Sequence, residues 1–375
     1  MGETWYSRRV RPGAEDQCQS AQLDNVIEHD PAWLFAQCDS GDKHILALTD
    51  GEDRLIPLFV HKGRLSFSIG ELTIGSLSVL RHVLVGNFTG ISRNSWLEAI
   101  QALCNGLTAR SAVFLLGVVD GEELDAALLS PELQNRLLVL QQGPVYQRRM
   151  CKLGTSLEEY LQGLSSKSRQ DVKRSLRRFQ NEYQGRFSLS VYSSASEVAT
   201  FLDTVEPVSR RTYQGKLLGL AIDKKGHIGH KALQGAKLGY TLCLLLTVDD
   251  KPIAWRIGFL YQNVFYSHHI GFEPELRRFH PGVVMHLETI RYLSESHPEI
   301  DILDMLYGDN DFKRKVGNST RQERNIYLFQ KNLYGRFAWV LLRSCNFVSQ
   351  KAGAALEYLG LKNTLRAVIR KIAAS

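Results

Sequence analysis

Three consecutive β-rich runs constrain the fold of this chain more than any other feature of its sequence. The runs YTLCLLLTV, IAWRIGFLY and VFYSHHIGF are separated only by short turns, which contain Asp249-Asp250 and Gln262-Asn263. Short turns between long runs of this kind are typical of an antiparallel meander. The spacing of apolar residues then becomes helical from Pro281-Gly282 onward, and the run DILDMLY predicts a return to a strand.

The start of that helix is a candidate anion site. The first N–H groups of a helix have no partner within it and carry a partial positive charge, so a phosphate is a natural ligand there. Arg277 and Arg278 lie just before the helix and can add charge-assisted hydrogen bonds. The sequence therefore predicts phosphate binding at this point.

The length of the chain bears on its domain organisation. A chain of 375 residues exceeds what one ordinary core uses, which favours two domains. In the first half, the helical spacing of SWLEAIQALCNGL and the strand-like runs around it predict one mixed α/β unit. The second half begins near Gly143-Pro144. We therefore expect an N-terminal lobe at 1–145, a second lobe at 146–335 and a basic tail at 336–375.

The overall charge and the cysteine pattern limit the kinds of ligand, metal and compartment that we expect for this protein. A formal net charge of +7 fits an anionic ligand, a membrane surface or nucleic acid, and it selects none of them. No helix-turn-helix, finger or zipper pattern is present, which argues against sequence-specific DNA binding. The six cysteines are scattered and show neither a C-x-x-C pair nor a zinc spacing, so we expect reduced thiols, a cytoplasmic protein and no metal. The polar N-terminus and the lack of an apolar run of about eighteen residues predict neither a secretory signal nor a membrane-spanning helix.

A further basic element lies in SLEEYLQGLSSKSRQDVKRSLRRFQNEY, which predicts two helices broken near Ser165. Arg169, Lys173 and Arg177 recur at i, i+4 and i+8 and form a cationic stripe. The stripe is either a solvated helix face or a surface that faces an anionic ligand, and the sequence leaves both interpretations open.

The tail at 336–375 contains many basic residues and a single acidic one, Glu357. Together with the adjacent apolar residues at 339–342, this composition favours an interfacial amphipathic helix pair that contacts anionic lipid. The alternative is a helix packed against the lobe with solvated basic side chains. The basic residues considered are Arg343, Lys351, Lys362, Arg366, Arg370 and Lys371.

An ordered set of short motifs resembles a known family. The set consists of His280-Pro281-Gly282, Asp304, Gly308, Asp309 and Phe312-Lys313. It resembles the GNAT acyltransferase superfamily and, more narrowly, its CelD-like branch of bacterial proteins linked to cellulose or exopolysaccharide production. The aromatic residue before the lysine is usually tyrosine in that branch, so Phe312 departs from the pattern. The segments LSSKSRQDVKRSLRR, PIAWRIGFLY, PAWLFAQ and RLIPLFV extend the resemblance along most of the chain. The family is built like the Fem-type aminoacyltransferases.

The resemblance implies an α/β (α+β) fold of two GNAT-like lobes, each a mixed and mostly antiparallel sheet flanked by helices, followed by a helical tail. The second lobe would carry the chemistry, with acyl-CoA as the donor. The donor would lie where the strands at 264–272 and 301–307 separate, with backbone N–H groups near Ser267 to Ile270 facing the thioester. Its pyrophosphate would lie at Pro281-Gly282-Val283.

Candidates for the catalytic base follow from the strand pattern. His268 and His269 are neighbours on a strand and must point to opposite faces, so one of them is expected to face the acceptor as a neutral base. The alternative is that one histidine is packed and the other solvated. Asp304 alternates with apolar neighbours, and a buried carboxylate must be paired or functional. It either pairs with Arg256 on a neighbouring strand or takes part in catalysis.

The charged turn after that strand is typical of a ligand-binding cleft, where polar turn residues are held by a rigid scaffold. Asp309 and Lys313 are catalytic candidates, and the family pattern includes Lys313. The alternative is an ordinary turn in which the aspartates and the lysine neutralise one another. The candidates for binding the acceptor are Arg169, Lys173, Arg256 and Phe312.

These expectations describe an acyltransferase that moves an acyl group, first of all acetyl, from acyl-CoA to an amine or hydroxyl of a small molecule or sugar, in exopolysaccharide or cell-envelope biosynthesis. One alternative is a Fem-like transferase that uses aminoacyl-tRNA and holds the RNA on the basic stripe. Another is a non-catalytic accessory protein of a polysaccharide assembly, which would not bind acyl-CoA. The tail would bring a cytoplasmic enzyme to the inner face of the membrane.

Overall fold

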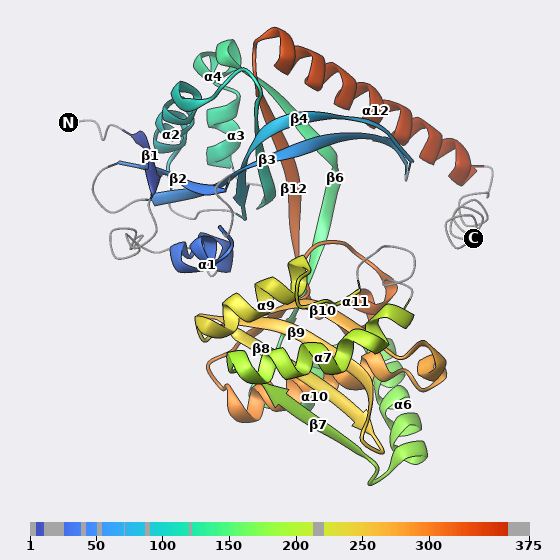
Figure 1. Cartoon of the computed structure of the whole chain (residues 1–375). Coiled ribbons are helices and arrows are strands. Elements are labelled where there is room, and N and C mark those ends of the chain that lie inside the picture. Colours follow the sequence, from blue (N-terminus) through green and yellow to red (C-terminus); the bar gives the residue numbers. More distant parts are fainter. Residues whose placement is uncertain are drawn as a thin grey trace. The chain divides into compact units, whose positions relative to one another are not determined.

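The computed structural model describes residues 5–10, 26–38, 43–50, 55–70, 72–86, 91–119, 122–212 and 221–358. These residues form two compact units (Figure 1). The first unit lies within Met1–Tyr146 and Gln322–Ile369, and the second lies within Gln147–Arg321. Each unit is a mostly antiparallel sheet flanked by helices, which confirms the predicted fold class.

The first unit has the strand order β1-β2-β3-β4-β5-β12-β6. All its strand pairs with a stated register are antiparallel except β4 and β5, which run parallel. Its strands are β1 (Tyr6–Val10), β2 (His44–Thr49), β3 (Leu55–Ile69), β4 (Leu72–Val85) and β5 (Ser111–Val119). Its helices are η2 (Ile27–His29), α1 (Pro31–Ala36), α2 (Arg93–Gly106), α3 (Glu122–Leu128), α4 (Pro131–Arg136) and α12 (Leu333–Tyr358).

Alternation along the strands of the first unit gives its sheet two apolar faces. Val113 and Leu115 of β5 pack with α2, α3 and α4, whereas Ala112 and Phe114 pack with α12. Because successive side chains of a strand point to opposite faces, α12 covers the face opposite to α2–α4. The predicted helix at SWLEAIQALCNGL is α2, which Ser92 caps by accepting a hydrogen bond from the Ser95 amide.

Two strands run from one unit into the other. Strand β6 (Leu137–Lys152) begins in the first unit and ends in the second, and β12 (Ser319–Gln330) returns to the first. The predicted boundary at 145 lies beside the first crossing. The sequence did not anticipate the second crossing: β12 pairs with β5 from Glu323 to Phe329, so the chain leaves the second unit well before the predicted boundary at 335. Of the predicted tail, residues 359–375 lie outside the described residues.

The second unit has the strand order β6-β11-β10-β9-β8-β7. Helices α6 and α10 contribute to the core on one face of its sheet, and α7 and α9 cover the other face (Figure 1). Its strands are β7 (Phe187–Tyr192), β8 (Thr241–Val248), β9 (Lys251–Tyr261), β10 (Val264–Phe272) and β11 (Ile302–Asp304). Its helices are α5 (Leu157–Gln162), α6 (Ser166–Tyr183), α7 (Ala195–Arg211), α9 (His227–Lys237), η3 (Pro274–Phe279), α10 (Pro281–Ser296) and α11 (Asp311–Val316).

The predicted meander is confirmed as β8, β9 and β10, which pair antiparallel in sequence order. The first turn is tight because Asp249 and Asp250 both adopt positive φ angles, 47° and 60°, as in a two-residue hairpin of the type I′ class. The predicted helix break near Ser165 is also confirmed. The Ser165 hydroxyl accepts a hydrogen bond from the Ser168 amide and so caps α6.

Candidate active site and arginine pocket

Strands β10 and β11 separate soon after they meet. They pair in parallel only from Val264, opposite Ile302, to Tyr266, opposite Asp304. Strand β10 then continues to Phe272, and no described strand pairs with it on that side. Backbone groups on this edge, from Ser267 to Phe272, therefore have no strand partner there among the described residues.

A β-bulge lies at the point of separation. Ser267 of β10 is opposite Gly258 of β9, but His269 is opposite Ile257, so His268 is an extra residue in the ladder. The bulge aims both histidines at one face. The ring of His268 packs edge-on against Phe259, and the ring of His269 is parallel to that of Trp255.

Trp255 and Phe259 are four residues apart on β9 and therefore share a face of the sheet. The prediction that His268 and His269 point to opposite faces is wrong, because the bulge interrupts the two-residue alternation on which it rested. The shared face is the one covered by α7 and α9. Lys231 of α9 confirms this placement, since its Nζ lies 3.3 Å from His268 Nε2.

Both imidazoles are neutral at pH 7. Burial, followed by the positive charge of Lys231, holds the pKa of His268 well below its usual 6.5. Burial alone lowers the pKa of His269 to about 4. The Nε2 lone pair of His268 is occupied by Lys231, whereas neither ring nitrogen of His269 has a hydrogen-bond partner among the described residues. His269 is therefore the histidine with an unoccupied acceptor nitrogen.

Asp304 is paired, but with Arg148 rather than with Arg256. Arg148 donates from Nε to Oδ1 at 2.9 Å and approaches Oδ2 with Nη2 at 2.8 Å, and both side chains are buried. Asp304 Oδ1 also accepts a hydrogen bond from the Leu306 amide at 2.8 Å. Asp304 lies opposite Tyr266 of β10 and on its face of the sheet. The carboxylate thus orders the chain where the two strands separate.

Arg256 points to the opposite face, into the core beneath α10. Its Nη2 lies 2.9 Å from His286 Nδ1, and neither its Nε nor its Nη1 has a partner among the described residues. Burial lowers the pKa of Arg256 to about 10. On its other side the His286 ring lies 3.2 Å from the Tyr160 hydroxyl. The predicted pairing of Arg256 with Asp304 is wrong because alternation along β9 and β10 places the two side chains on different faces.

Lys313 lies at the mouth of the gap between the strands. Its Nζ donates hydrogen bonds to the carbonyl oxygens of Leu306, at 3.2 Å, and Tyr307. Burial lowers the pKa of Lys313 to about 8, although the negative charge of Asp304 opposes the shift. An ammonium group with this pKa exchanges its proton near neutral pH, which is a property of catalytic acids and bases.

The charged turn is not a set of aspartates neutralised by Lys313. Asp309 accepts hydrogen bonds from the Nε atoms of Arg149 and Arg314, both at 3.0 Å. Phe312 packs edge-on against the ring of His286 and so faces the core. Its position does not support direct contact with an acceptor at the strand gap.

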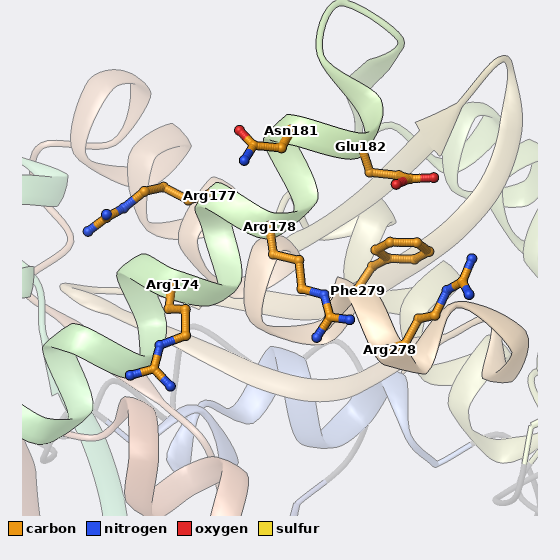
Figure 2. A pocket seen from close by; sticks show the side chains of 7 residues that line it. All are labelled: Arg174, Arg177, Arg178, Asn181, Glu182, Arg278 and Phe279. Carbon is orange, nitrogen blue, oxygen red and sulfur yellow. The ribbon is translucent and has the colours of Figure 1, made fainter.

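A cationic pocket lies between α6 and η3 (Figure 2). Its volume is about 630 Å³. The side chains of Arg178 and Arg278 approach the Phe279 ring from two sides, with guanidinium carbons 6.0 and 4.6 Å from its centroid. Four guanidinium groups and one carboxylate surround the opening, so the pocket attracts anions. Its lining residues, which we call the arginine pocket, are Arg174, Arg177, Arg178, Asn181, Glu182, Arg278 and Phe279.

The arginine pocket contains some of the predicted cations and leaves others out. Arg278 lines it, but Arg277, Arg169 and Lys173 do not. Lys173 instead pairs with Glu158 at 3.1 Å. The predicted stripe ran along i, i+4 and i+8, whereas the pocket uses the helix face of Arg174, Arg177 and Arg178. That spacing of three and four residues was the signal in the sequence that could have identified it.

The N-terminus of α10 offers fewer amides than predicted. Pro281 has no N–H group, and the Val283 amide donates to the His280 carbonyl at 2.9 Å. Among the first three residues of the helix, only Gly282 has an amide without a partner in the described structure. A Cβ at Gly282 would lie 3.3 Å from the Phe272 ring, so the backbone packs closely there. An anion at this point would depend more on the arginine pocket than on the helix.

A positive charge of the arginine pocket also acts on the residue that precedes α10. Burial, then the positive charges of Lys315 and Arg178, lowers the pKa of His280, the residue before the helix.

No cluster of metal-ligating side chains occurs in the part of the chain that the structure describes. Within the same part, every helix is too short or too polar to cross a bilayer.

Comparison with known proteins finds one family model that matches part of the second unit. Residues 166–314, which lie in the second unit, match the family model of the acetyltransferase (GNAT) domain. No curated protein matches the chain. The narrower likeness to the CelD-like branch has no counterpart among these matches.

Solved structures share the fold at low sequence identity. FemX is 10% identical with a TM-score of 0.59, and the match covers 89% of this chain and 99% of that one. A conserved protein of unknown function from Bacteroides thetaiotaomicron is 14% identical with a TM-score of 0.52, over 86% and 99% of the two chains. L-PGS from Bacillus licheniformis is 12% identical with a TM-score of 0.50, over 90% and 98%.

Proposed function

We propose that the second unit transfers an acyl group, first of all acetyl, from acyl-CoA to an amine or hydroxyl of a small molecule or sugar. One observation carries the proposal. Strand β10 leaves β11 after three residue pairs, at a bulge, within a segment that matches the GNAT domain. A gap of this kind exposes backbone groups that can hold a thioester and stabilise the charge on its carbonyl oxygen during transfer. We place the reaction in exopolysaccharide or cell-envelope biosynthesis.

The donor would lie along the free edge of β10. Its thioester would face Ser267 to Ile270, and its phosphates would extend toward the Gly282 amide and the arginine pocket. Support comes from the four guanidinium groups of that pocket, since arginine forms strong paired hydrogen bonds with phosphate.

The transfer requires one base. The acceptor nitrogen or oxygen attacks the thioester carbonyl carbon, the C–S bond breaks, and the acceptor's proton passes to the base while the CoA sulfur leaves. Lys313, with a pKa of about 8, is the group best matched to this step near neutral pH. His269 is the second candidate because its ring nitrogens have no described partner. Asp304 and Arg148 would act by positioning the chain around them.

Calorimetry with acetyl-CoA and longer acyl-CoAs tests the donor. We expect binding in the micromolar range. Arg178→Glu and Arg278→Glu should each weaken it by about tenfold or more, because each replaces attraction for phosphate by repulsion. Lys167→Glu, on α6 but outside the pocket, is the matched control and should have little effect. Unchanged affinity in both pocket variants would exclude the arginine pocket as the phosphate site.

Kinetics as a function of pH tests the base. If the neutral amine of Lys313 accepts the proton, kcat/KM should rise with pH until Lys313 is deprotonated, near pH 8. Lys313→Met should lower kcat by roughly 10²–10⁴-fold and remove this rise. His269→Gln provides the comparison: a larger loss in that variant, with a pH profile that Lys313→Met leaves unchanged, would transfer the role to the histidine.

A second candidate is transfer from aminoacyl-tRNA. The arginine pocket favours it as well, because RNA phosphates would be attracted to the same guanidinium groups. Binding of tRNA with steep salt dependence, and no heat with any acyl-CoA, would select this candidate. Failure to bind either ligand would instead favour a non-catalytic accessory role in a polysaccharide assembly.

A further inference from the structure

Helix α12 of the first unit buries one side and exposes apolar groups on the other. Its inner side, with Ala338, Leu342 and Cys345, packs on the sheet, and the helix runs along the long β3–β4 hairpin (Figure 1). Its outer side exposes large apolar side chains, and Leu333 is 89% exposed. Exposed apolar groups concentrated on one face indicate an interaction surface. We call this surface the α12 outer face; its apolar members are Leu333, Phe337, Val340, Phe347 and Val348.

The charges on the same face are all positive. Arg336, Arg343 and Lys351 are exposed, and no acidic residue occurs from Leu333 to Lys351. Two of these cations lie against aromatic rings of the helix. The Arg343 guanidinium carbon is 4.8 Å from the Trp339 ring centroid, and Lys351 Nζ is 5.7 Å from that of Phe347. Cationic and aromatic groups are therefore interleaved along one surface.

The tip of the β3–β4 hairpin adds to this surface. The Gly70 amide donates to the Ser349 hydroxyl of α12 at 3.0 Å, which ties the hairpin turn to the helix. Just beyond the turn, Leu72 and Ile74 are exposed. Two further apolar side chains thus lie at the end of the hairpin that α12 contacts.

We propose that the α12 outer face, together with the hairpin tip, docks on a membrane surface that contains anionic phospholipid. Exposed phenylalanine, valine and leucine would enter the boundary between headgroups and acyl chains, while arginine and lysine would contact the phosphates. The absence of carboxylates on the face from Leu333 to Lys351 is the observation that favours lipid. A binding face for a protein partner would be expected to carry both positively and negatively charged side chains around its rim. This docking does not depend on the chemistry proposed for the second unit.

Vesicle flotation of the full chain tests the proposal. We expect binding to vesicles of phosphatidylcholine with phosphatidylglycerol, little binding to phosphatidylcholine alone, and release as salt is raised. Phe347→Glu should reduce binding by tenfold or more, because it places a charge at the lipid boundary. Leu129→Glu is the matched control: its side chain is 69% exposed, against 60% for Phe347, but it lies between α3 and α4.

Neutralising the cations tests the headgroup contact. Replacing Arg336, Arg343 and Lys351 by glutamine should weaken binding roughly fivefold per residue, and about a hundredfold for the triple variant. The control triple replaces Lys225, Lys237 and Lys251, which are exposed lysines of the second unit, and should leave binding unchanged. Thermal unfolding of every variant would establish that the fold is kept.

Three results would overturn the proposal. These are equal affinity for both kinds of vesicle, no affinity for either, and equal losses in the face variants and their controls. Sedimentation would detect the alternative occupant, a second copy of the chain. A dimer that dissociates on Phe347→Glu, without lipid binding, would assign the face to self-association instead.

Discussion

The second unit buries two arginines and satisfies them in different ways. Arg148 is 5% exposed and makes a two-pronged ion pair with Asp304. Arg256 is 1% exposed and has one hydrogen bond, to His286, with no carboxylate partner among the described residues. The first lies where β10 and β11 separate, and the second lies in the core beneath α10.

The difference shows what each charge contributes. A buried ion pair regains in attraction much of what its charges lose on leaving water, but it becomes strongly destabilising when one partner is removed. A buried cation without a counter-ion has no such attraction to lose, and the lowered pKa of Arg256 reflects that loss of hydration. We therefore expect the chain to depend on Arg148 for order at the strand gap and to tolerate an apolar side chain in place of Arg256.

The largest effect is expected at the ion pair. Asp304→Asn should lower the free energy of unfolding by about 3–5 kcal/mol, because it leaves Arg148 buried and unpaired. Urea unfolding of the purified protein measures this. The double variant Arg148→Met with Asp304→Leu removes both charges and should regain most of the loss. A double variant as unstable as Asp304→Asn alone would contradict the prediction that the loss arises from leaving Arg148 unpaired.

The second-largest effect on stability is expected from acid pH, because the folded chain holds buried histidines in their neutral form. The pKa of His269 is lowered from 6.5 to about 4, so its contribution is complete above pH 6.5 and falls as the pH drops toward 4, where only the unfolded chain takes up the proton. The loss would reach no more than about 3 kcal/mol for this residue. His29 and His82 of the first unit have similarly lowered pKa values, so the test is the difference in pH dependence between the unmodified chain and His269→Gln.

Arg256→Met should have a smaller effect. We expect the free energy of unfolding to stay within about 1 kcal/mol of the unmodified chain, or to rise, because an apolar side chain replaces an unpaired buried cation. Arg148→Met is the matched control and should destabilise strongly by leaving Asp304 unpaired. If both variants lose the same amount in urea unfolding, the contrast between the two arginines is wrong. The pKa of His286, followed by NMR, should rise in Arg256→Met, since the arginine's charge is one cause of its depression.

The smallest effect on the free energy of unfolding is expected at an exposed ion pair. Lys173 and Glu158 form a pair at 3.1 Å at the surface of the same unit. Lys173→Gln should change the free energy of unfolding by only about 0.2–1 kcal/mol, and the change should vanish at high salt. A loss comparable to that of Asp304→Asn would show that solvent exposure does not make the Lys173–Glu158 pair weaker than the Arg148–Asp304 pair.

Local pattern was enough to predict most of the elements around the site. The meander, the amphipathic α6 and the helix that begins at Pro281 were all evident, because periodicity and turn residues act over a few positions. Lys313 and Arg278 were candidates from the sequence. In the structure Lys313 donates a hydrogen bond to the Leu306 carbonyl, and Arg278 lines the arginine pocket. Their roles in binding or catalysis stay predictions.

Long-range relations decided the rest. The partner of Asp304 is 156 residues away on β6, and nothing local favoured Arg148 over Arg256. The bulge at His268 depends on the register between β9 and β10, which is set by packing along both strands. The arginine pocket needs η3 beside α6, an approach that helix periodicity alone does not encode.

The amino-acid sequence by itself thus determined which segments become strands and helices and which face of α6 is apolar, since those outcomes follow from neighbouring residues. Only the tertiary structure decided which buried charge is paired, which face both histidines share and where the cations gather. Hydrogen bonds and ion pairs fall off within a few ångströms, so they depend on distances that the chain acquires only when it is folded.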